Sequence, residues 1–203
     1  MTQGGGVRAA RREQAVEALL DAALESLVTV GFAATTTRGV AQLAGVSQGL
    51  QQHYFPTKAA LIDAAINRLA TRLLEEASRP VEGATERQRA ELLLRRLWDS
   101  FSSPVLTVVA ELLVLARIHP DTAEKTAATL VAVTDRVVAV AEEALPTYAR
   151  RPGFRDALLL ALSAIRDTTT VARIPGTERA LPTCETITAG FLSAFNEKPH
   201  RRR

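Results

Sequence analysis

Apolar residues recur every three or four positions along most of the chain, a spacing that places them on one face of an α-helix. Alternation of apolar and polar residues, which would indicate strands, is rare. Breaks that contain proline or glycine separate the periodic segments. Helices are expected over residues 11–30, 56–77, 86–102, 104–118, 121–145, 154–173 and 181–196. The pattern therefore predicts an all-α protein.

A break around Arg79 and Pro80 divides the helical pattern into two parts. The helix before this break is long enough to leave one domain and enter the next. We therefore expect an N-terminal domain over residues 1–58, in which the glycine-rich residues 1–7 are a disordered arm, a linking helix over residues 59–80, and a second domain over residues 81–203.

Two short helices joined by a tight turn are expected after the first helix. Thr36 or Thr37 can cap the first of them, and Ser47 can cap the second. Gly45 lies between them, where the chain commonly needs a residue that tolerates positive φ. Ala41 is small enough to let the two helices approach closely. This arrangement is typical of a DNA-binding helix-turn-helix, although an ordinary corner of a helical bundle would use the same elements.

In such a motif the N-terminal part of the second helix enters the major groove and contacts base edges. Glutamine can bind adenine through two hydrogen bonds, and three glutamines fall within five residues of this helix. Gly49 has no side chain and lets the backbone come close to DNA. The candidate base-contacting residues are Ser47, Gln48, Gly49, Gln51, Gln52 and His53.

The flanks of the motif make this assignment more specific. The run from Gly31 to Lys58 reads GFAATTTRGVAQLAGVSQGLQQHYFPTK and resembles the N-terminal signature of TetR-family transcriptional regulators. In that family a Gly-Phe turn, the two short helices and an aromatic-x-x-Lys closure occur together. The matching residues are Gly31, Phe32, Thr37, Ala41, Ala44, Gly45, Val46, Ser47, Gly49, Phe55 and Lys58.

The resemblance also implies contacts to the DNA backbone. Arg38, Thr57 and Lys58 stand where members of the family contact phosphate, with assistance from helix N-termini. His53 or Tyr54 would also bond to the backbone of the operator.

The chain departs from the usual form of the motif at Leu50, Gln51, Gln52 and Tyr54. Residue 51 is normally apolar and packs the recognition helix onto its domain. Leu50 and Tyr54 lie four residues apart and could provide this anchor instead. The sequence leaves open which of the glutamines face the bases.

In TetR-like proteins the helices of the second domain enclose a cavity for a small organic effector. Apolar helices that carry a few aromatic and polar residues suit such a cavity. Ordinary core packing is the alternative for Trp98 and Phe101, and Glu111 either faces solvent, pairs with another helix or lines the cavity. The candidate pocket residues are Trp98, Phe101, Glu111, Leu115, His119, Val133, Ile165 and Thr169.

The last two helices have more apolar surface than packing against one core requires. In the family, two such helices pack against their copies in a four-helix bundle and form a two-fold dimer. The resemblance therefore implies a homodimer, although a monomer could bury this surface internally. The candidate interface residues are Phe154, Leu158, Leu162, Ile187, Phe191 and Phe195.

The net charge of +3, from 25 basic and 22 acidic residues, is too small to indicate nucleic acid binding by itself. Any affinity for DNA must come from the placement of a few cations. The single cysteine, Cys184, excludes an internal disulfide and fits a reducing compartment; a redox sensor is the less favoured interpretation. No apolar run approaches the ~20 residues of a membrane span, so we expect a cytoplasmic protein.

Sequence motifs for catalysis are absent, including phosphate-binding loops, HExxH and a nucleophile elbow. The three histidines are far apart in the sequence, which disfavours a metal site. We therefore expect neither an enzyme nor a protein that requires a cofactor or a metal.

These features together predict a homodimeric repressor that binds a pseudo-palindromic operator in double-stranded DNA and is released by a small organic effector. One alternative is a helical small-molecule-binding protein or enzyme that retains the helical corner without a DNA function. Another is a constitutive DNA-binding protein that has no inducer.

Overall fold

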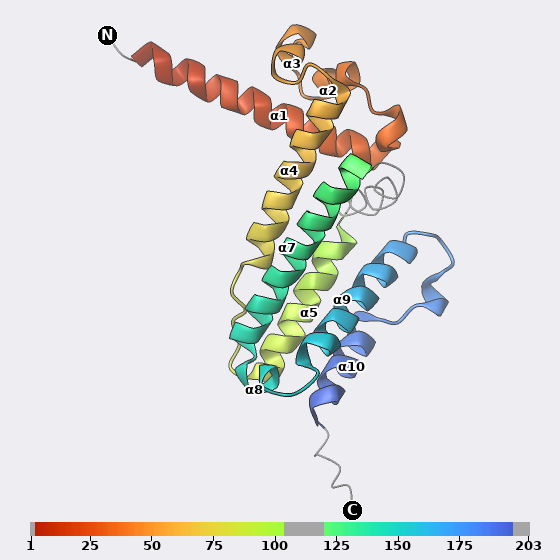
Figure 1. Ribbon diagram of the computed structural model, residues 1–203. Helices are drawn as coiled ribbons and strands as arrows, with labels where there is room; N and C mark the ends of the chain where they lie inside the picture. The colour runs from red at the N-terminus through yellow and green to blue at the C-terminus, as the bar shows by residue number, and fades with distance from the viewer. Residues whose placement is uncertain (1–2, 104–119, 197–203) are drawn as a thin grey trace, which may run out of the picture. The chain divides into compact units, whose positions relative to one another are not determined.

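The computed structural model describes residues 3–103 and 120–196, and every regular element in these two ranges is a helix (Figure 1). The predicted all-α class is therefore confirmed. The elements are α1 (Gln3–Ala34), α2 (Thr37–Leu43), α3 (Gln48–Tyr54), α4 (Lys58–Ala77), α5 (Glu86–Ser102), α7 (Pro120–Ala144), α8 (Pro146–Ala149), α9 (Phe154–Val171), the short 3₁₀ helix η1 (Glu178–Ala180) and α10 (Cys184–Asn196).

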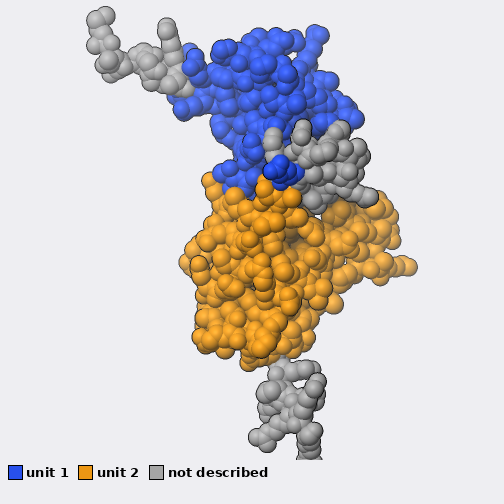
Figure 2. Space-filling model, viewed as in Figure 1, with its two compact units in different colours: residues 1–73, 107–126 blue, residues 74–106, 127–203 orange. Residues whose placement is uncertain are grey.

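The helices form two compact units (Figure 2). Among the described residues, unit 1 comprises residues 3–73 and 120–126, and unit 2 comprises residues 74–103 and 127–196. Both α4 and α7 contribute residues to each unit. The functional division into residues 1–58, 59–80 and 81–203 stays a prediction.

The expected disordered arm is wrong for residues 3–7, because α1 already begins at Gln3. The three consecutive glycines each disfavour a helix by about 1 kcal/mol relative to alanine, but none of them forbids helical dihedral angles. Only Val7 lies between these glycines and Arg8, so neither a proline nor a capping residue interrupts the helix there. Composition alone therefore misplaced the start of the helix.

At its other end α1 is interrupted at Gly31, where the backbone takes φ 76° and ψ 171°. These angles are open to glycine but strained for residues with a side chain. A final helical turn follows and is closed by Thr35, whose hydroxyl donates to the carbonyl oxygen of Gly31 at 2.8 Å. The predicted interruption at Gly31 is confirmed, and it redirects the chain toward α2.

Unit 1 is held together by an apolar core and by ion pairs between α1 and α4. Its fully buried side chains include Leu19, Leu27, Val40 and Leu61. On the rim of this core the Arg68 guanidinium pairs with Glu17 and Asp21, and Arg72 pairs with Asp21 at 2.8 Å. The hydrogen bond to Glu17, followed by the attraction of Asp21, raises the pKa of Arg68 despite its burial.

Unit 2 is built around a core to which α5, α7, α9 and α10 all contribute. Leu94, Leu145, Leu158 and Ile165 have no exposed surface in it. At one end lies a cluster of rings whose neighbouring centroids are 5.2 to 6.1 Å apart, formed by Tyr148, Phe154, Phe191 and Phe195.

Arginine side chains donate hydrogen bonds to carbonyl groups at or just after the C-terminal ends of several helices of unit 2. Carbonyl groups in the last turn of a helix have no partner within that helix, and a cation is favourable there. Arg89 donates to the Ala144 carbonyl at the end of α7 at 2.5 Å, and Arg173 donates to the Ser103 carbonyl after α5 at 2.8 Å. Arg96 donates to the Arg79 carbonyl after α4, also at 2.8 Å.

Candidate nucleic-acid interface

The helix-turn-helix lies in unit 1 and is built as the sequence predicts. Thr36 caps α2 by accepting a hydrogen bond from the amide of Gly39 at 3.0 Å, and Ser47 caps α3 by accepting one from the amide of Leu50 at 3.2 Å. Gly45 takes a φ of 67° in the turn between them. The caps and the glycine thus confirm the predicted motif, and Thr36 rather than Thr37 is the first cap.

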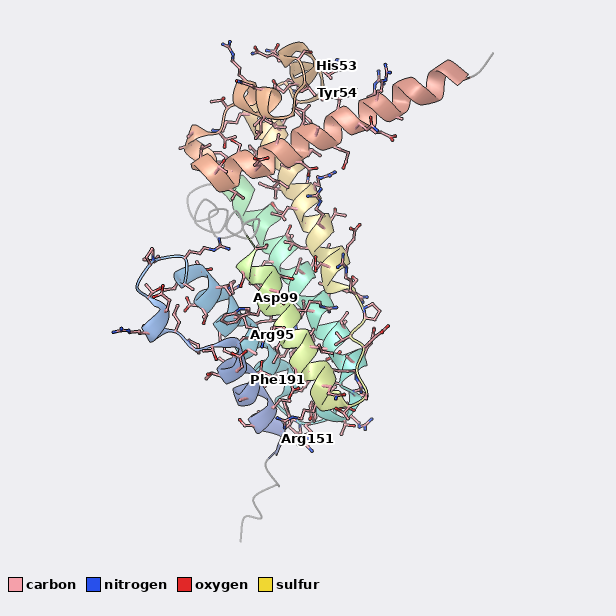
Figure 3. All side chains as sticks on the ribbon, turned by 180° about the vertical axis from the view of Figure 1, so that it is seen from behind. His53, Tyr54, Arg95, Asp99, Arg151 and Phe191 are labelled. Atoms are coloured by element: carbon pink, nitrogen blue, oxygen red, sulfur yellow. The ribbon has the colours of Figure 1, made fainter. Side chains whose placement is uncertain are left out.

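One side of α3 is exposed, and it carries two of the three glutamines. Gln48, Gly49, Gln52 and His53 are all exposed. With 3.6 residues per turn, these four positions fall on one continuous arc of the helix. We call this arc the reading face. Figure 3 shows the side chains of His53 and Tyr54 at the end of α3, and their rings meet edge to face with centroids 5.1 Å apart.

Gln51 is not part of the reading face, so its assignment as a base-contacting residue is corrected. Its side chain is only 1% exposed. The amide Nε2 donates to the carbonyl oxygen of Phe55 at 2.7 Å, which makes burial of the polar group tolerable. Leu50 and Tyr54, the expected replacement anchors, are half-buried on either side. Gln51 itself therefore occupies the packing position.

The three residues expected to contact phosphate differ in how many hydrogen bonds their side chains already make within the protein. Arg38 is exposed, and no described residue forms an ion pair or a side-chain hydrogen bond with it. The Thr57 hydroxyl oxygen accepts a hydrogen bond from the amide of Ala60 at 3.1 Å, which leaves the hydroxyl hydrogen available. The Lys58 ammonium donates to the Phe32 carbonyl at 2.6 Å, so at least one of its three donors is used within the protein.

The candidate pocket residues in the described ranges lie in or near the core of unit 2. Ile165 and Thr169 of α9 are buried, and Trp98 and Phe101 of α5 are half-buried against the same core. Val133 of α7 is half-buried and lies outside that cluster. The remaining candidates lie outside the described residues: Glu111, Leu115 and His119. A ligand site here stays a prediction.

The candidate dimer residues pack inside their own protomer, which corrects the predicted interface. Five of them are buried members of the unit 2 core: Phe154, Leu158, Ile187, Phe191 and Phe195. Leu162 is half-buried against it. The predicted apolar stripe is real, and within this chain it packs against the rest of unit 2.

Leu160 belongs to the excess apolar surface expected on α9, although it was not among the candidate interface residues, and at 73% it is the most exposed large apolar side chain in the described ranges. It belongs to the run Leu158-Leu159-Leu160-Ala161-Leu162, in which every position is apolar. Such a run carries no periodicity from which an inner and an outer side could be separated. The polar residues Asp156 and Ser163 on the same side of the helix were the available signal.

Cys184 lies at the start of α10 and is 4% exposed. Burial raises the pKa of its thiol, and the nearby Arg95 offsets this only in part. A raised pKa lowers the thiolate fraction and hence the reactivity, which argues against a redox sensor. Within the described ranges no group of three or more His, Cys, Asp or Glu side chains could hold a metal ion, and no helix is both long and apolar enough to cross a membrane.

Comparison with known proteins places the helix-turn-helix in a family. Residues 19–65 match the model of the bacterial regulatory proteins of the tetR family. The chain is 36% identical over 87 residues to the HTH-type transcriptional regulator BetI of Burkholderia thailandensis, a match that covers 43% of each protein. The DNA-binding domain of this chain is that of the TetR family. The chain matches less than half the length of this curated relative.

Solved structures of transcriptional regulators have the same fold over most of the chain. A transcriptional regulator from Rhodococcus sp. Rha1 is 26% identical, with a TM-score of 0.62 over 87% of this chain and 91% of that one. A TetR transcription regulator from Haloarcula marismortui is 18% identical, with a TM-score of 0.66 over 90% and 95%. The fold is therefore that of a TetR regulator, an N-terminal helix-turn-helix domain followed by a helical domain. These relatives are regulators and not enzymes, as the sequence predicts.

Proposed function

We propose that this TetR-family protein is a homodimeric repressor that reads a pseudo-palindromic operator with α3 and is released from it by a small organic effector. The observation that carries the proposal is the composition of the reading face. Its two glutamines are one helical turn apart, exposed, and without a side-chain hydrogen bond to any described residue. Because the chromosome lies in the cytoplasm, the protein would act there.

The reading face suits direct contact with bases in the major groove. Gln48 and Gln52 would each bind an adenine through its N6 and N7 groups. Gly49 lies beside them on the arc, faces open space and has no side chain, so the surface stays low there. Arg38 and the Thr57 hydroxyl would bind phosphates on either side and fix the register of the helix.

The proposed dimer uses the outer sides of α9 and α10 in place of the buried residues first considered. On α9 this side carries Leu160, and on α10 it carries small residues that permit close packing of helices: Thr186, Ala189, Gly190 and Ser193. A two-fold axis at this surface would make the contact self-complementary. Two recognition helices would then enter half-sites about 34–36 Å apart.

The proposed effector site lies where α5 packs against α9, near Trp98, Phe101 and Thr169. Apolar walls with a few polar groups suit a small organic molecule. Such a ligand can release DNA only if it binds the free conformation more tightly than the DNA-bound one. A constitutive DNA-binding protein would lack this differential affinity.

Selection of bound sequences from a random duplex library, followed by gel shifts on the enriched sequence, tests the DNA function. The wild-type protein is expected to enrich a two-fold symmetric motif whose binding weakens steeply with salt. Gln48→Ala and Gln52→Ala should each relax one base-pair position in both half-sites. Enrichment of no motif would favour a small-molecule-binding protein without DNA function. Failure of every compound in an effector screen to release the motif would favour a constitutive regulator.

A further inference from the structure

Gln51 is the only polar residue of α3 that is fully buried. Other side chains of unit 1 with 1% exposure or less include Leu19, Leu27 and Leu61. A buried primary amide is unfavourable unless both its donor and its acceptor are hydrogen-bonded. The bonding of this side chain therefore indicates why a glutamine is tolerated there.

Two hydrogen bonds join Gln51 to Phe55 and close the C-terminal end of α3. The amide of Phe55 donates to the main-chain carbonyl of Gln51 at 2.8 Å, and the side-chain Nε2 of Gln51 donates to the carbonyl of Phe55 at 2.7 Å. The Phe55 carbonyl leads directly into Pro56 and the N-terminus of α4. The glutamine thus fixes the recognition helix to the turn that follows it.

The other half of the amide gains nothing from this position. The Oε1 atom is buried and accepts no hydrogen bond from any residue that the structure describes. A side chain selected for stability alone would be apolar here, because an unsatisfied buried acceptor is destabilising. The directional bond to Phe55 is the property that an apolar side chain of the same size cannot provide.

The orientation of α3 depends on such end contacts because the helix has only seven residues. A helix of this length is not stable alone. Its N-terminus is fixed by the Ser47 cap, and its C-terminus by Gln51 and Phe55. Gln48 and Gln52 lie about 60° and 100° around the helix axis from the buried Gln51, on the same flank, and both side chains are exposed.

We propose that Gln51 is a positioning residue, which fixes the rotation of α3 about its axis so that Gln48 and Gln52 face the bases, while Gln51 itself does not contact DNA. This inference rests on the DNA-reading function proposed above. A rotated helix would still bind phosphate through its flanks but would present its glutamines poorly. Gln51 therefore determines the specificity for DNA sequence and not the overall affinity for DNA.

The test compares Gln51→Met with Gln52→Met in the full-length protein. Both substitutions replace the amide by an apolar chain of similar length, one inside the unit and one on the reading face. Each variant is assayed by selection from a random duplex library and by its affinities for the wild-type motif and for random DNA. Circular dichroism during urea unfolding reports the stability of each variant.

Gln51→Met is expected to unfold at the same urea concentration as wild type or a higher one. Its affinity for the motif relative to random DNA should fall about tenfold, the order of one bidentate pairing with a base, and preference should weaken at several base pairs. Gln52→Met should lose preference at one base pair in each half-site.

Three results would overturn the proposal. Unchanged specificity in Gln51→Met would make the residue a packing element, and loss at one base pair only would make it a base contact. If Gln51→Met does not fold, Gln51→Leu replaces it in the same assays, and failure of both to fold would assign Gln51 to stability. A wild-type protein that enriches no motif would instead refute the DNA-reading function itself.

Discussion

The Lys58 ammonium lies 4.5 Å from the centroid of the Phe32 ring and donates a hydrogen bond to the carbonyl oxygen of the same residue at 2.6 Å. Phe32 belongs to the final turn of α1, beyond the interruption at Gly31, and Lys58 is the first residue of α4. The lysine therefore joins the two helices that flank the helix-turn-helix. The aromatic-x-x-Lys closure noted in the sequence has a structural role in addition to any contact with DNA.

Replacement of this lysine should loosen the end of α1. Lys58→Met removes both the charged hydrogen bond and the attraction of the ammonium to the ring, which should cost about 1–2 kcal/mol for a half-buried group. Hydrogen exchange of the amides between Gly31 and Thr36, measured by mass spectrometry, should become about tenfold faster. Arg38→Met, at an exposed residue without a described partner, should leave these rates unchanged. Equal rates in both variants would show that the lysine adds no stability there.

Arg38 should act on DNA without affecting the fold. We expect Arg38→Ala to weaken binding to the enriched motif and to random DNA by the same factor. The slope of log K against log salt should become shallower by about 0.9 for each phosphate that the variant no longer neutralises. Arg151→Ala, an exposed arginine of unit 2 labelled in Figure 3, is the matched control and should leave both quantities unchanged. A weakening confined to the motif would instead indicate that Arg38 reads a base.

Leu160 should determine whether the protein is a dimer. Burial of a leucine side chain contributes about 1.5–3 kcal/mol, and a two-fold interface would bury two copies. Leu160→Glu should therefore shift the protein to monomers in sedimentation velocity experiments. Leu92→Glu changes another exposed leucine of unit 2, one that is 51% exposed on α5, and should leave the dimer intact. If Leu92→Glu alone gave monomers, the dimer surface would lie on α5.

Protonation of Glu86 at acid pH should lower the stability of unit 2. Its carboxylate accepts hydrogen bonds from the amides of Thr147, at 2.9 Å, and Tyr148, at 3.2 Å. Burial raises the pKa of Glu86, but the bonds from Thr147 and Tyr148 and the charge of Arg89 together outweigh it, so the pKa lies below its ordinary value. The stabilisation is therefore present at neutral pH and is lost as the pH falls below about 4.

Urea unfolding between pH 7 and pH 3 can measure this dependence. At pH 7 the free energy of unfolding of Glu86→Gln should be about 1 kcal/mol lower than that of wild type. This value is at the low end of the range for a hydrogen bond to a charged group, because Glu86 is only half-buried. The difference should shrink as Glu86 becomes protonated. Glu82→Gln, at an exposed carboxylate nearby, should match wild type at every pH. A difference that stays constant with pH would mean that the charge of Glu86 is not what stabilises the protein.

Most of the helices and the helix-turn-helix could be predicted because their signals are local. A cap needs one hydroxyl at a helix start, as at Thr36 and Ser47, and positive φ favours glycine, as at Gly45. These preferences act within a few residues, so the sequence shows them directly. The helix over residues 3–7 was missed because the glycine content shows only that a helix is disfavoured there. It does not show whether the rest of α1 stabilises the helix enough to form.

The orientation of a side chain could not be predicted where it depends on a contact that the hydropathy pattern does not show. Gln51 counts as polar in any hydropathy pattern, yet a bond to a carbonyl four residues later makes its burial possible. The stripe containing Phe154 and Leu158 was recognised as apolar, but periodicity cannot say whether such a stripe packs on its own core or on a second chain. Both errors concern the partner of a residue and not the helix that carries it.

Because α3 has an exposed arc and a separate packed side, its proposed DNA-contacting residues can be substituted independently of the residues that hold the helix in place. Gln48 and Gln52 make no side-chain hydrogen bond to any other described residue, and the caps and the Gln51 bond lie elsewhere on the helix. Substitutions on the arc can therefore accumulate without disturbing the scaffold that supports them. Duplicated copies could diverge toward new target sites through two or three residues, and the same positions are where target preference can be redesigned.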